Sequence, residues 1–200
     1  MFVIGITGGT GAGKTSALRA LDSLGALVID CDAVYHELLI SSAGLKSDLE
    51  ARWSGVTQNG KIDRKRLGEI VFGDSSALKE LNAITHKYVS AEVDRRLADW
   101  SAQGGTVAAI DAIALVESGR SKKCDAVIGV TAPKETRISR IMSRDGITRE
   151  QAEIRVNAQK PDSFYRENCD HMLEGKYDTP EEFEDECRKF FDGLLNGYDR

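Results

Sequence analysis

Runs of mainly apolar residues alternate with helical patterns at both ends of this chain. The runs cover residues 2–6, 26–29, 106–110 and 126–131, and a weaker run lies near residues 171–173. Between the first two runs, the apolar positions of residues 17–24 have helical spacing, and Gly25 provides a stop signal. A strand, a helix and a strand within about 30 residues predict a right-handed βαβ unit whose strands end at the same edge of a parallel sheet.

The middle of the chain, from Ala33 to Trp100, has a helical pattern instead. Its first part carries apolar residues at helical spacing, and Asn59–Gly60 marks a turn. A clearer stripe, with apolar residues mostly three or four positions apart, then runs from Leu78 to Trp100. These segments predict a helical insertion between the second and third strands of the sheet.

The last third of the chain predicts three more helices. Two of them cover about residues 134–144 and 149–159. The third begins with Thr179, Pro180 and Glu182, which together form the sequence signature of a capping box. The whole pattern indicates an α/β fold with a parallel five-stranded sheet and a helical insertion.

Length and composition limit the functions that this fold can serve. With 200 residues the chain is long enough for one domain with an insertion. Its net charge of −5 disfavours bulk binding to nucleic acid or anionic membranes. It has neither an apolar run of about 20 residues nor a leader, and its four cysteines form no C-x-x-C pair. We expect a soluble cytoplasmic protein, a monomer or weak homo-oligomer, that binds neither nucleic acid nor membrane.

The most informative motif follows the first run, where residues 8–15 match G-x-x-x-x-G-K-[ST]. We call these residues the phosphate loop. Its glycines let backbone N–H groups point toward phosphate oxygens, and the following helix adds the partial positive charge of its N-terminus. Lys14 is expected to reach the β- and γ-phosphates of ATP, and the Thr15 hydroxyl to ligate Mg²⁺. The predicted ATP contacts are Gly9, Thr10, Gly11, Ala12, Gly13, Lys14, Thr15 and Ser16.

Two further features favour a small kinase over other nucleotide-binding proteins. The Asn-Lys-x-Asp element with which GTPases read guanine is not formed, because in residues 59–63 a glycine separates the Asn from the Lys. Arg137, Arg140 and Arg144 share one face of the predicted helix after the fourth strand. Such arginines can form a lid over the transferring phosphate, but the same spacing also fits a solvated basic stripe.

Three aspartates at predicted strand ends are candidate catalytic carboxylates. Asp30 and Asp32 follow the second strand, where a carboxylate can orient an acceptor hydroxyl and take its proton. Asp32 alternatively fits the N-cap of a helix that starts at Ala33. Asp111, at the end of the third strand, fits either a metal-side acid or another helix cap.

Taken together, these residues resemble one family, the dephospho-coenzyme A kinases, over nearly the whole chain. The resemblance rests on the phosphate loop with its preceding strand, on the Asp-x-Asp of residues 30–32, and on signatures at residues 60–72 and 81–86. It continues through residues 111–119, 130–133, 140–145 and 158–159. Many families share the phosphate loop, but the Asp-x-Asp, the Asn-x-x-x-His and the Arg-Asp lid in this order are much more specific.

The resemblance implies the P-loop kinase fold, a three-layer sandwich, and one reaction, in which ATP phosphorylates the 3′-hydroxyl of dephospho-coenzyme A. On this likeness Asp32 orients the acceptor, Lys14 and Arg140 act on the transferring phosphate, and Mg²⁺ accompanies ATP. The implied acceptor contacts are Asp32, Arg64, His86, Leu115 and Glu117. The implied organisation is a single domain with core segments of about residues 1–32, 101–136 and 166–200, an acceptor-binding insertion of about 33–100 and a lid of about 137–165.

Three positions depart from the family pattern, and other kinases remain alternatives. Lys87 and Ile113–Ala114 stand where the family usually has proline, and Gly175 stands where it often has asparagine. The second candidate is a small P-loop kinase for a nucleoside monophosphate, shikimate or gluconate, and the third is a nucleotide-sensing module. Only the insertion motifs favour dephospho-coenzyme A over the other acceptors.

Overall fold

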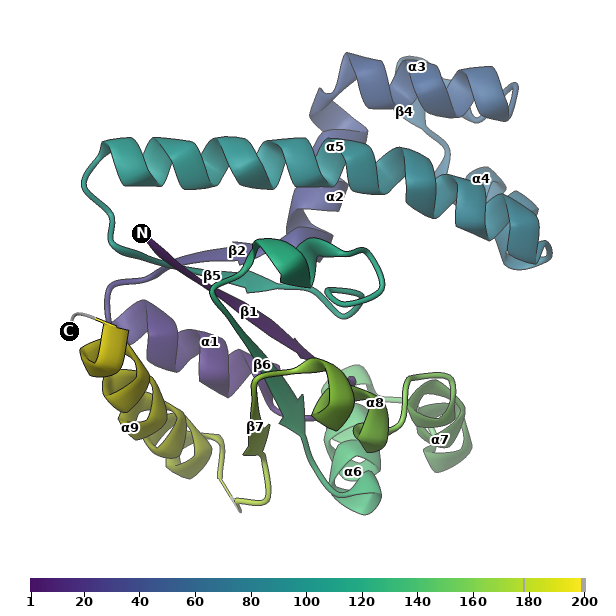
Figure 1. Cartoon of the computed structure of the whole chain (residues 1–200). Coiled ribbons are helices and arrows are strands. Elements are labelled where there is room, and N and C mark those ends of the chain that lie inside the picture. Colours follow the sequence, from purple (N-terminus) through teal and green to yellow (C-terminus); the bar gives the residue numbers. More distant parts are fainter. Residues whose placement is uncertain (178, 199–200) are drawn as a thin grey trace. The chain divides into compact units, whose positions relative to one another are not determined.

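The computed structural model describes residues 1–177 and 179–198, which form two compact units. The core unit comprises Met1–Ile29 and the chain from Trp100 onward, and the insertion unit comprises Asp30–Asp99. The positions of the two units relative to one another are not determined, so each is described by itself (Figure 1).

A parallel sheet of five strands forms the centre of the core unit. Its strands are β1 (Phe2–Gly8), β2 (Leu27–Asp30), β5 (Val107–Asp111), β6 (Ala126–Thr131) and β7 (His171–Glu174), in the order β2-β5-β1-β6-β7. β1 lies in the middle, with its Ile6 opposite Asp111 of β5 and its Ile4 opposite Ala126 of β6. All residues of β1 and β6 are buried, which explains why both strands read as continuous apolar runs. The parallel sheet with flanking helices confirms the fold class predicted from the sequence.

Two helices, α1 (Lys14–Ser23) and α9 (Pro180–Tyr198), pack side by side against the sheet (Figure 1). Leu21 of α1 and Phe191 of α9 are buried in one apolar cluster with Ile4 of β1. The predicted capping box of α9 is formed, because the Thr179 hydroxyl accepts from the Glu182 N–H at 3.2 Å. This packing fixes the start of α1, which follows the phosphate loop.

The region predicted as a lid contains three helices. α6 (Lys134–Asp145) and α7 (Arg149–Asn157) form a hairpin in which Ile138 and Ile141 pack against Ala152 and Val156. A short helix, α8 (Asp162–Asn168), follows and was not predicted. Seven residues are too few to display a helical period, so the sequence pattern could not reveal it.

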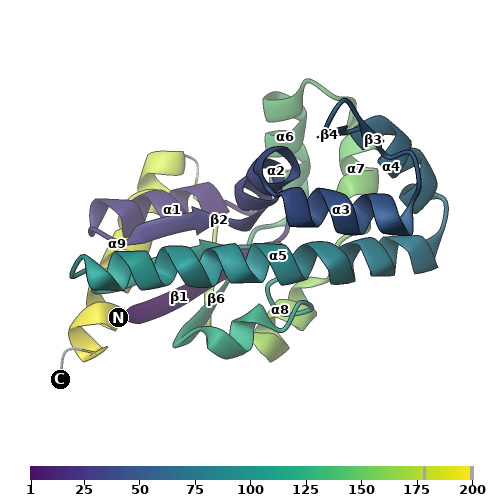
Figure 2. The same ribbon diagram turned by 90° about the horizontal axis from the view of Figure 1, so that it is seen from above.

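The insertion unit is mainly helical, as predicted. It consists of α2 (Cys31–Ser41), α3 (Ala43–Arg52), a hairpin of β3 (Thr57–Gln58) and β4 (Lys61–Ile62), α4 (Arg64–Phe72) and most of α5 (Ser75–Ala102). The predicted turn at Asn59–Gly60 joins the two short strands of the hairpin. A separate apolar cluster gathers Leu45 and Leu49 of α3, Leu39 of α2 and Leu67 of α4. α5 runs unbroken over 28 residues (Figure 2).

In the described part of the chain, no helix is both long and apolar enough to span a membrane.

Candidate active site

The phosphate loop connects β1 to α1 and has a backbone that only glycine adopts readily. Gly11 and Gly13 have φ values of +79° and +109°. Gly13 is also the N-cap of α1 and provides no side-chain cap to the N–H groups of the first turn. This is the arrangement in which a helix N-terminus binds phosphate. The Lys14 ammonium donates to the Gly8 carbonyl at 2.9 Å, which keeps the cation at the loop.

Two side chains of the lid region hold the phosphate loop in place. The carboxamide of Gln159, which follows α7, accepts from the Thr10 N–H at 2.9 Å and donates to the Thr10 hydroxyl at 2.7 Å. Arg137 of α6 donates from Nε to the Thr10 carbonyl at 3.0 Å and from a terminal nitrogen to the Gln159 carboxamide oxygen. Only 6% of Arg137 is exposed. A cation with so little water around it is suited to bind a phosphate anion.

Arg140 lies one turn further along α6 and contacts another part of the loop. It donates to the carbonyls of Gly11 and Tyr177, each at 3.3 Å. Burial lowers the pKa of Arg140, so an anionic neighbour would stabilise its charge. Arg144 instead forms an ion pair with Asp145 at 2.7 Å. The solvated-stripe interpretation is therefore wrong for the first two arginines of this face and fits only the third.

The segment after β7 also packs against the loop, next to Arg140. Gly175 lies so close to the Ala12 carbonyl that a Cβ at this position would overlap the oxygen. Phe183 of α9 fills the space beside Gly13 and stacks on Tyr177, with ring centroids 5.7 Å apart. The glycine at position 175, where the family often has asparagine, is thus explained by its close approach to the loop.

Oxygen donors suited to Mg²⁺ lie at the start of α1 and at the end of β5. Thr15 is exposed in the first turn of α1, and Asp111 is half-buried at the carboxyl end of β5, beside β1. A hydroxyl and a carboxylate are ligands that Mg²⁺ accepts while it keeps several waters, so this pair fits the ion. Along the chain the next helix after Asp111 begins at Arg120 with Gly119 as its N-cap, so the alternative interpretation of Asp111 as a helix cap is wrong.

Three residues of the core unit that were predicted to contact ATP or the acceptor have surroundings that limit this role or add another. The Ser16 hydroxyl donates to the Pro180 carbonyl at 3.2 Å, so this residue is left to contact phosphate through its backbone. Leu115 is fully buried, and its carbonyl accepts from the Ser121 N–H at 3.0 Å, so neither its side chain nor its backbone is exposed to an acceptor in this structure. Glu117 is exposed, and its charge adds to burial in raising the pKa of Tyr165 of α8.

In the insertion unit, the hydrogen bonds distinguish the roles of Asp30 and Asp32. Asp30 is the N-cap of α2, because its carboxylate accepts from the N–H groups of Asp32 at 2.8 Å and Ala33 at 3.1 Å. Asp32 lies exposed in the first turn of α2, and its carboxylate is not the cap. The interpretation of Asp32 as a helix cap is therefore wrong.

Arg64 and His86 lie on different helices of the insertion unit. Arg64 begins α4, and its charge partly opposes the burial that raises the pKa of Tyr35 on α2. This places Arg64 near the face of α2 that also carries Asp32, one turn earlier. His86 is exposed on α5, and the next residue is Lys87, where the family usually has proline. A proline there would remove a helical hydrogen bond, whereas lysine leaves α5 unbroken.

The structure adds Gln159 and Tyr177 to the residues around the phosphate loop. Gln159 lies 149 positions from Thr10 in the sequence, so no local spacing could connect them. The family resemblance includes residues 158–159 and was the sequence signal that pointed to Gln159, although it did not reveal the contact with Thr10.

Comparison with known proteins gives a single family. The family model described as dephospho-CoA kinase matches residues 2–181. A dephospho-CoA kinase of Geobacter sulfurreducens is 41% identical over 163 residues, which cover 80% of this chain and 83% of the relative. The corresponding protein of Thermobifida fusca is 38% identical and covers 80% of each chain.

Solved structures agree with this result. The protein TT1252 of Thermus thermophilus superimposes with a TM-score of 0.79 at 29% identity and covers 98% of this chain and 97% of its own. The dephospho-CoA kinase of Campylobacter jejuni has a TM-score of 0.61 at 25% identity over 96% of each chain. A shikimate kinase of Acinetobacter baumannii, at 17% identity and a TM-score of 0.58 over 98% of this chain and 94% of its own, shares the fold. The family model, the relatives and the phosphate-loop geometry lead to one conclusion: this chain belongs to the dephospho-CoA kinase family.

Proposed function

We propose that this protein transfers the γ-phosphate of ATP to the 3′-hydroxyl of dephospho-coenzyme A and releases coenzyme A and ADP. The observation that carries the proposal is the pair of lid arginines at the phosphate loop, in a chain of this family. Arg137 and Arg140 contact loop carbonyls, and neither of them forms an ion pair with a carboxylate in the described part of the chain. Two cations at a loop that offers a helix N-terminus suit a triphosphate.

The core unit binds and orients the triphosphate in this proposal. The first turn of α1 and Lys14 hold the β- and γ-phosphates, while Arg137 and Arg140 balance the charge that spreads over the γ-phosphate oxygens during transfer. Mg²⁺, held by Thr15 and Asp111, supplies further neutralisation of the phosphate charge when bound. The side chain of Gln159 keeps Thr10 in its place at the loop throughout.

The acceptor side of the reaction is assigned to Asp32. A bond forms between the 3′-oxygen and the γ-phosphorus, and the bond from this phosphorus to the β–γ bridging oxygen breaks. The electron pair of that bond leaves with ADP, and the proton of the hydroxyl passes to the Asp32 carboxylate. Because the transition state of such transfers is loose, orientation of the hydroxyl matters more than the base strength of the carboxylate. Arg64, His86 and Glu117 are the proposed contacts to the rest of the acceptor.

Dependence on Mg²⁺, a cytoplasmic location and a monomeric or weakly associated state complete the proposal. They are supported by the donor pair at Thr15 and Asp111, by the family and by the composition. Shikimate kinase shares only the fold at 17% identity, so phosphorylation of a smaller alcohol remains a test outcome rather than a second proposal.

The first experiment measures ADP release from Mg-ATP with dephospho-coenzyme A, adenosine, AMP, shikimate or gluconate, and identifies the product by mass spectrometry. One added phosphate on dephospho-coenzyme A alone is the expected result. Turnover of another acceptor instead would keep the kinase chemistry and reject the proposed substrate. Binding of ATP without turnover of any acceptor would indicate a sensor.

Asp32→Asn tests the role of the proposed acceptor-orienting carboxylate. We expect kcat to fall by about 100-fold or more, with a much smaller change in KM for ATP, mainly because the amide orients the hydroxyl less well than the carboxylate and also because it cannot take the proton. Steady-state kinetics with dephospho-coenzyme A measure both constants. A change in KM alone would show that Asp32 binds the substrate without taking part in transfer.

A further inference from the structure

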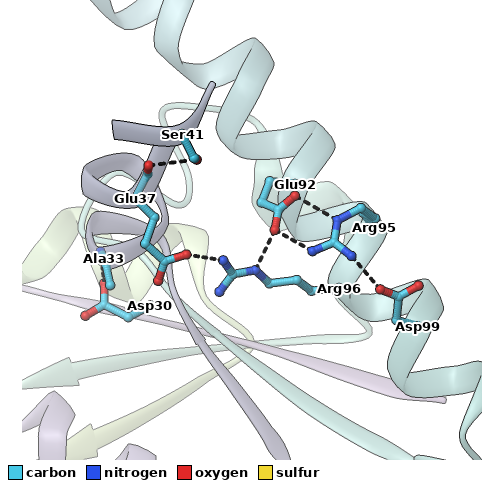
Figure 3. A network of polar contacts seen from close by, with 8 residues as sticks. All are labelled: Asp30, Ala33, Glu37, Ser41, Glu92, Arg95, Arg96 and Asp99. Atoms are coloured by element: carbon cyan, nitrogen blue, oxygen red, sulfur yellow. Dashed lines mark hydrogen bonds and ion pairs between the residues drawn. The ribbon is translucent and has the colours of Figure 1, made fainter. Parts of the chain in front are cut away.

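The helix that carries Asp32 is held by apolar packing and by an ion pair. Leu39 is buried in the apolar cluster of the insertion unit, together with Ala77 of α5, and Tyr35 of α2 packs against the same cluster. Two residues before Leu39, the exposed side chain of Glu37 forms an ion pair with Arg96 of α5 (Figure 3). Glu37 follows Asp32 by five residues, which is about 7.5 Å along the helix axis. The ion pair therefore adds a charged link to α5 within two turns of Asp32.

The guanidinium of Arg96 is also held by a second carboxylate, on its own helix. Its Nε donates to Glu92, one turn earlier on α5, at 2.9 Å. The Glu92 carboxylate also accepts two hydrogen bonds from Arg95, at 2.7 and 2.8 Å, and is thereby fixed from its other side. Only 30% of the Arg96 side chain and 19% of the Glu92 side chain are exposed. A planar guanidinium with one edge bound in this way presents its other nitrogens in a defined direction.

The two arginines of this network have different reach. Arg95 contacts Glu92 and, at 2.6 Å, Asp99, so all of its partners lie on α5 (Figure 3). Of the two, Arg96 reaches α2, through Glu37. Loss of Arg95 removes ion pairs within one helix, whereas loss of Arg96 also removes the ion pair between the two helices. The chain thus contains its own matched control.

We propose that Arg96 is a positioning residue, which acts through Glu37 to set the orientation of α2 and so aligns the Asp32 carboxylate with the acceptor hydroxyl. This inference rests on the proposed function, because it takes Asp32 as the orienting carboxylate. Misalignment of a reacting group by about 1 Å can reduce a rate 100-fold, although the ion pairs involved contribute little to stability. The predicted signature is consequently a loss of kcat without a matching loss of folding stability.

The experiment compares Arg96→Gln with Arg95→Gln in phosphate transfer from ATP to dephospho-coenzyme A. We expect kcat to fall about tenfold in Arg96→Gln and to stay within about twofold of the original in Arg95→Gln. Because the core unit is untouched, KM for ATP should stay unchanged in both variants. Circular dichroism and thermal melting of both variants verify that they are folded. Equal losses of kcat in the two variants would overturn the proposal.

A second pair of variants separates positioning from a general structural effect. If Arg96 acts through Asp32, Arg96→Gln should change kcat by less than about twofold when Asp32 is already Asn. If Arg96 acts through Glu37, the Glu37→Gln variant should show the same loss as Arg96→Gln, and the double variant no greater loss. Glu37 is exposed, so its substitution by glutamine provides a folded variant even if loss of Arg96 prevents folding. Equal loss of kcat with and without Asp32 would overturn the proposal.

The same measurements distinguish failure of the inference from failure of the proposed function. A native chain that does not phosphorylate dephospho-coenzyme A, or an Asp32→Asn variant with full kcat, would overturn both. A strong effect of Asp32→Asn together with an unchanged kcat in Arg96→Gln would overturn the positioning role alone.

Discussion

The phosphate loop and the Asp32 helix, one in each unit, are held in place by different kinds of interaction. The loop is enclosed by buried or half-buried side chains, among them Arg137 and Phe183, and a Cβ at Gly11 would lie only 2.8 Å from the Arg137 carbonyl oxygen. α2 has buried apolar residues as well, but its charged contacts, the capping carboxylate of Asp30 and the Glu37–Arg96 ion pair, are formed by exposed or partly exposed side chains. The charged contacts of the loop are thus buried, and those of the helix lie at the surface.

This difference has energetic consequences. Hydrogen bonds to charged groups contribute about 1.5–3 kcal/mol each, whereas ion pairs between exposed side chains contribute about 0.2–1 kcal/mol. Changes around the loop should therefore affect stability and phosphate transfer strongly. Substitutions around α2 should change the free energy of unfolding only slightly. They should lower mainly the rate of phosphate transfer.

The largest effect is expected at Arg140, which contacts the loop, in comparison with Arg144 on the same helix. Arg140→Ala should reduce kcat by about 100- to 1000-fold, because a preorganised cation that stabilises the transferring phosphate is lost. Arg144→Ala should change kcat by no more than about threefold, since Arg144 is an exposed partner of Asp145. Steady-state kinetics with ATP and dephospho-coenzyme A measure both variants.

The pair also tests one side of the comparison, the buried charged contacts of the loop. Similar losses in Arg140→Ala and Arg144→Ala would mean that the lid acts through its overall charge rather than through contact with the loop. A loss in Arg140→Ala confined to KM for ATP would assign Arg140 to nucleotide binding alone.

A smaller effect, on stability, is expected from Gly175→Ala. The added Cβ would overlap the Ala12 carbonyl, so the loop or the segment after β7 must shift, at a cost of about 1–3 kcal/mol in the free energy of unfolding. Gly193→Ala is the matched control, because this glycine lies on α9 with open space around it. Alanine there should raise the free energy of unfolding by about 0.5–1 kcal/mol. Urea denaturation of both variants measures these changes, and a neutral Gly175→Ala would show that the loop can move freely.

The same contrast explains what could be predicted from the sequence. The five strands of the sheet were found because each is a short apolar run between stop signals, and the phosphate loop because its motif is local. The contacts of Thr10 with Gln159 and of Glu37 with Arg96 join residues 149 and 59 positions apart. Periodicity reports only which residues share a face of one element, so it cannot pair side chains across such distances. The hairpin of β3 and β4 was missed because its two-residue strands show no alternation.

The smallest expected effect concerns the charge of Glu92, at the centre of the network around α5. Hydrogen bonds from Arg95 and Arg96 lower the pKa of Glu92 from 4.5 to about 2. Because the folded state favours the carboxylate, the stabilisation is complete above pH 4.5 and is lost as the pH falls toward 2. Glu92→Gln should therefore lower the free energy of unfolding by no more than about 1 kcal/mol at pH 7. The difference from the native chain should shrink as the pH falls from 4.5 to 2.

Urea denaturation at several pH values measures this difference in the free energy of unfolding. About 1 M salt at pH 7 should reduce the same difference by screening. A difference that persists at low pH and in salt would mean that Glu92 acts through packing, and the contrast between buried charged contacts at the loop and surface charges at the helix would then fail.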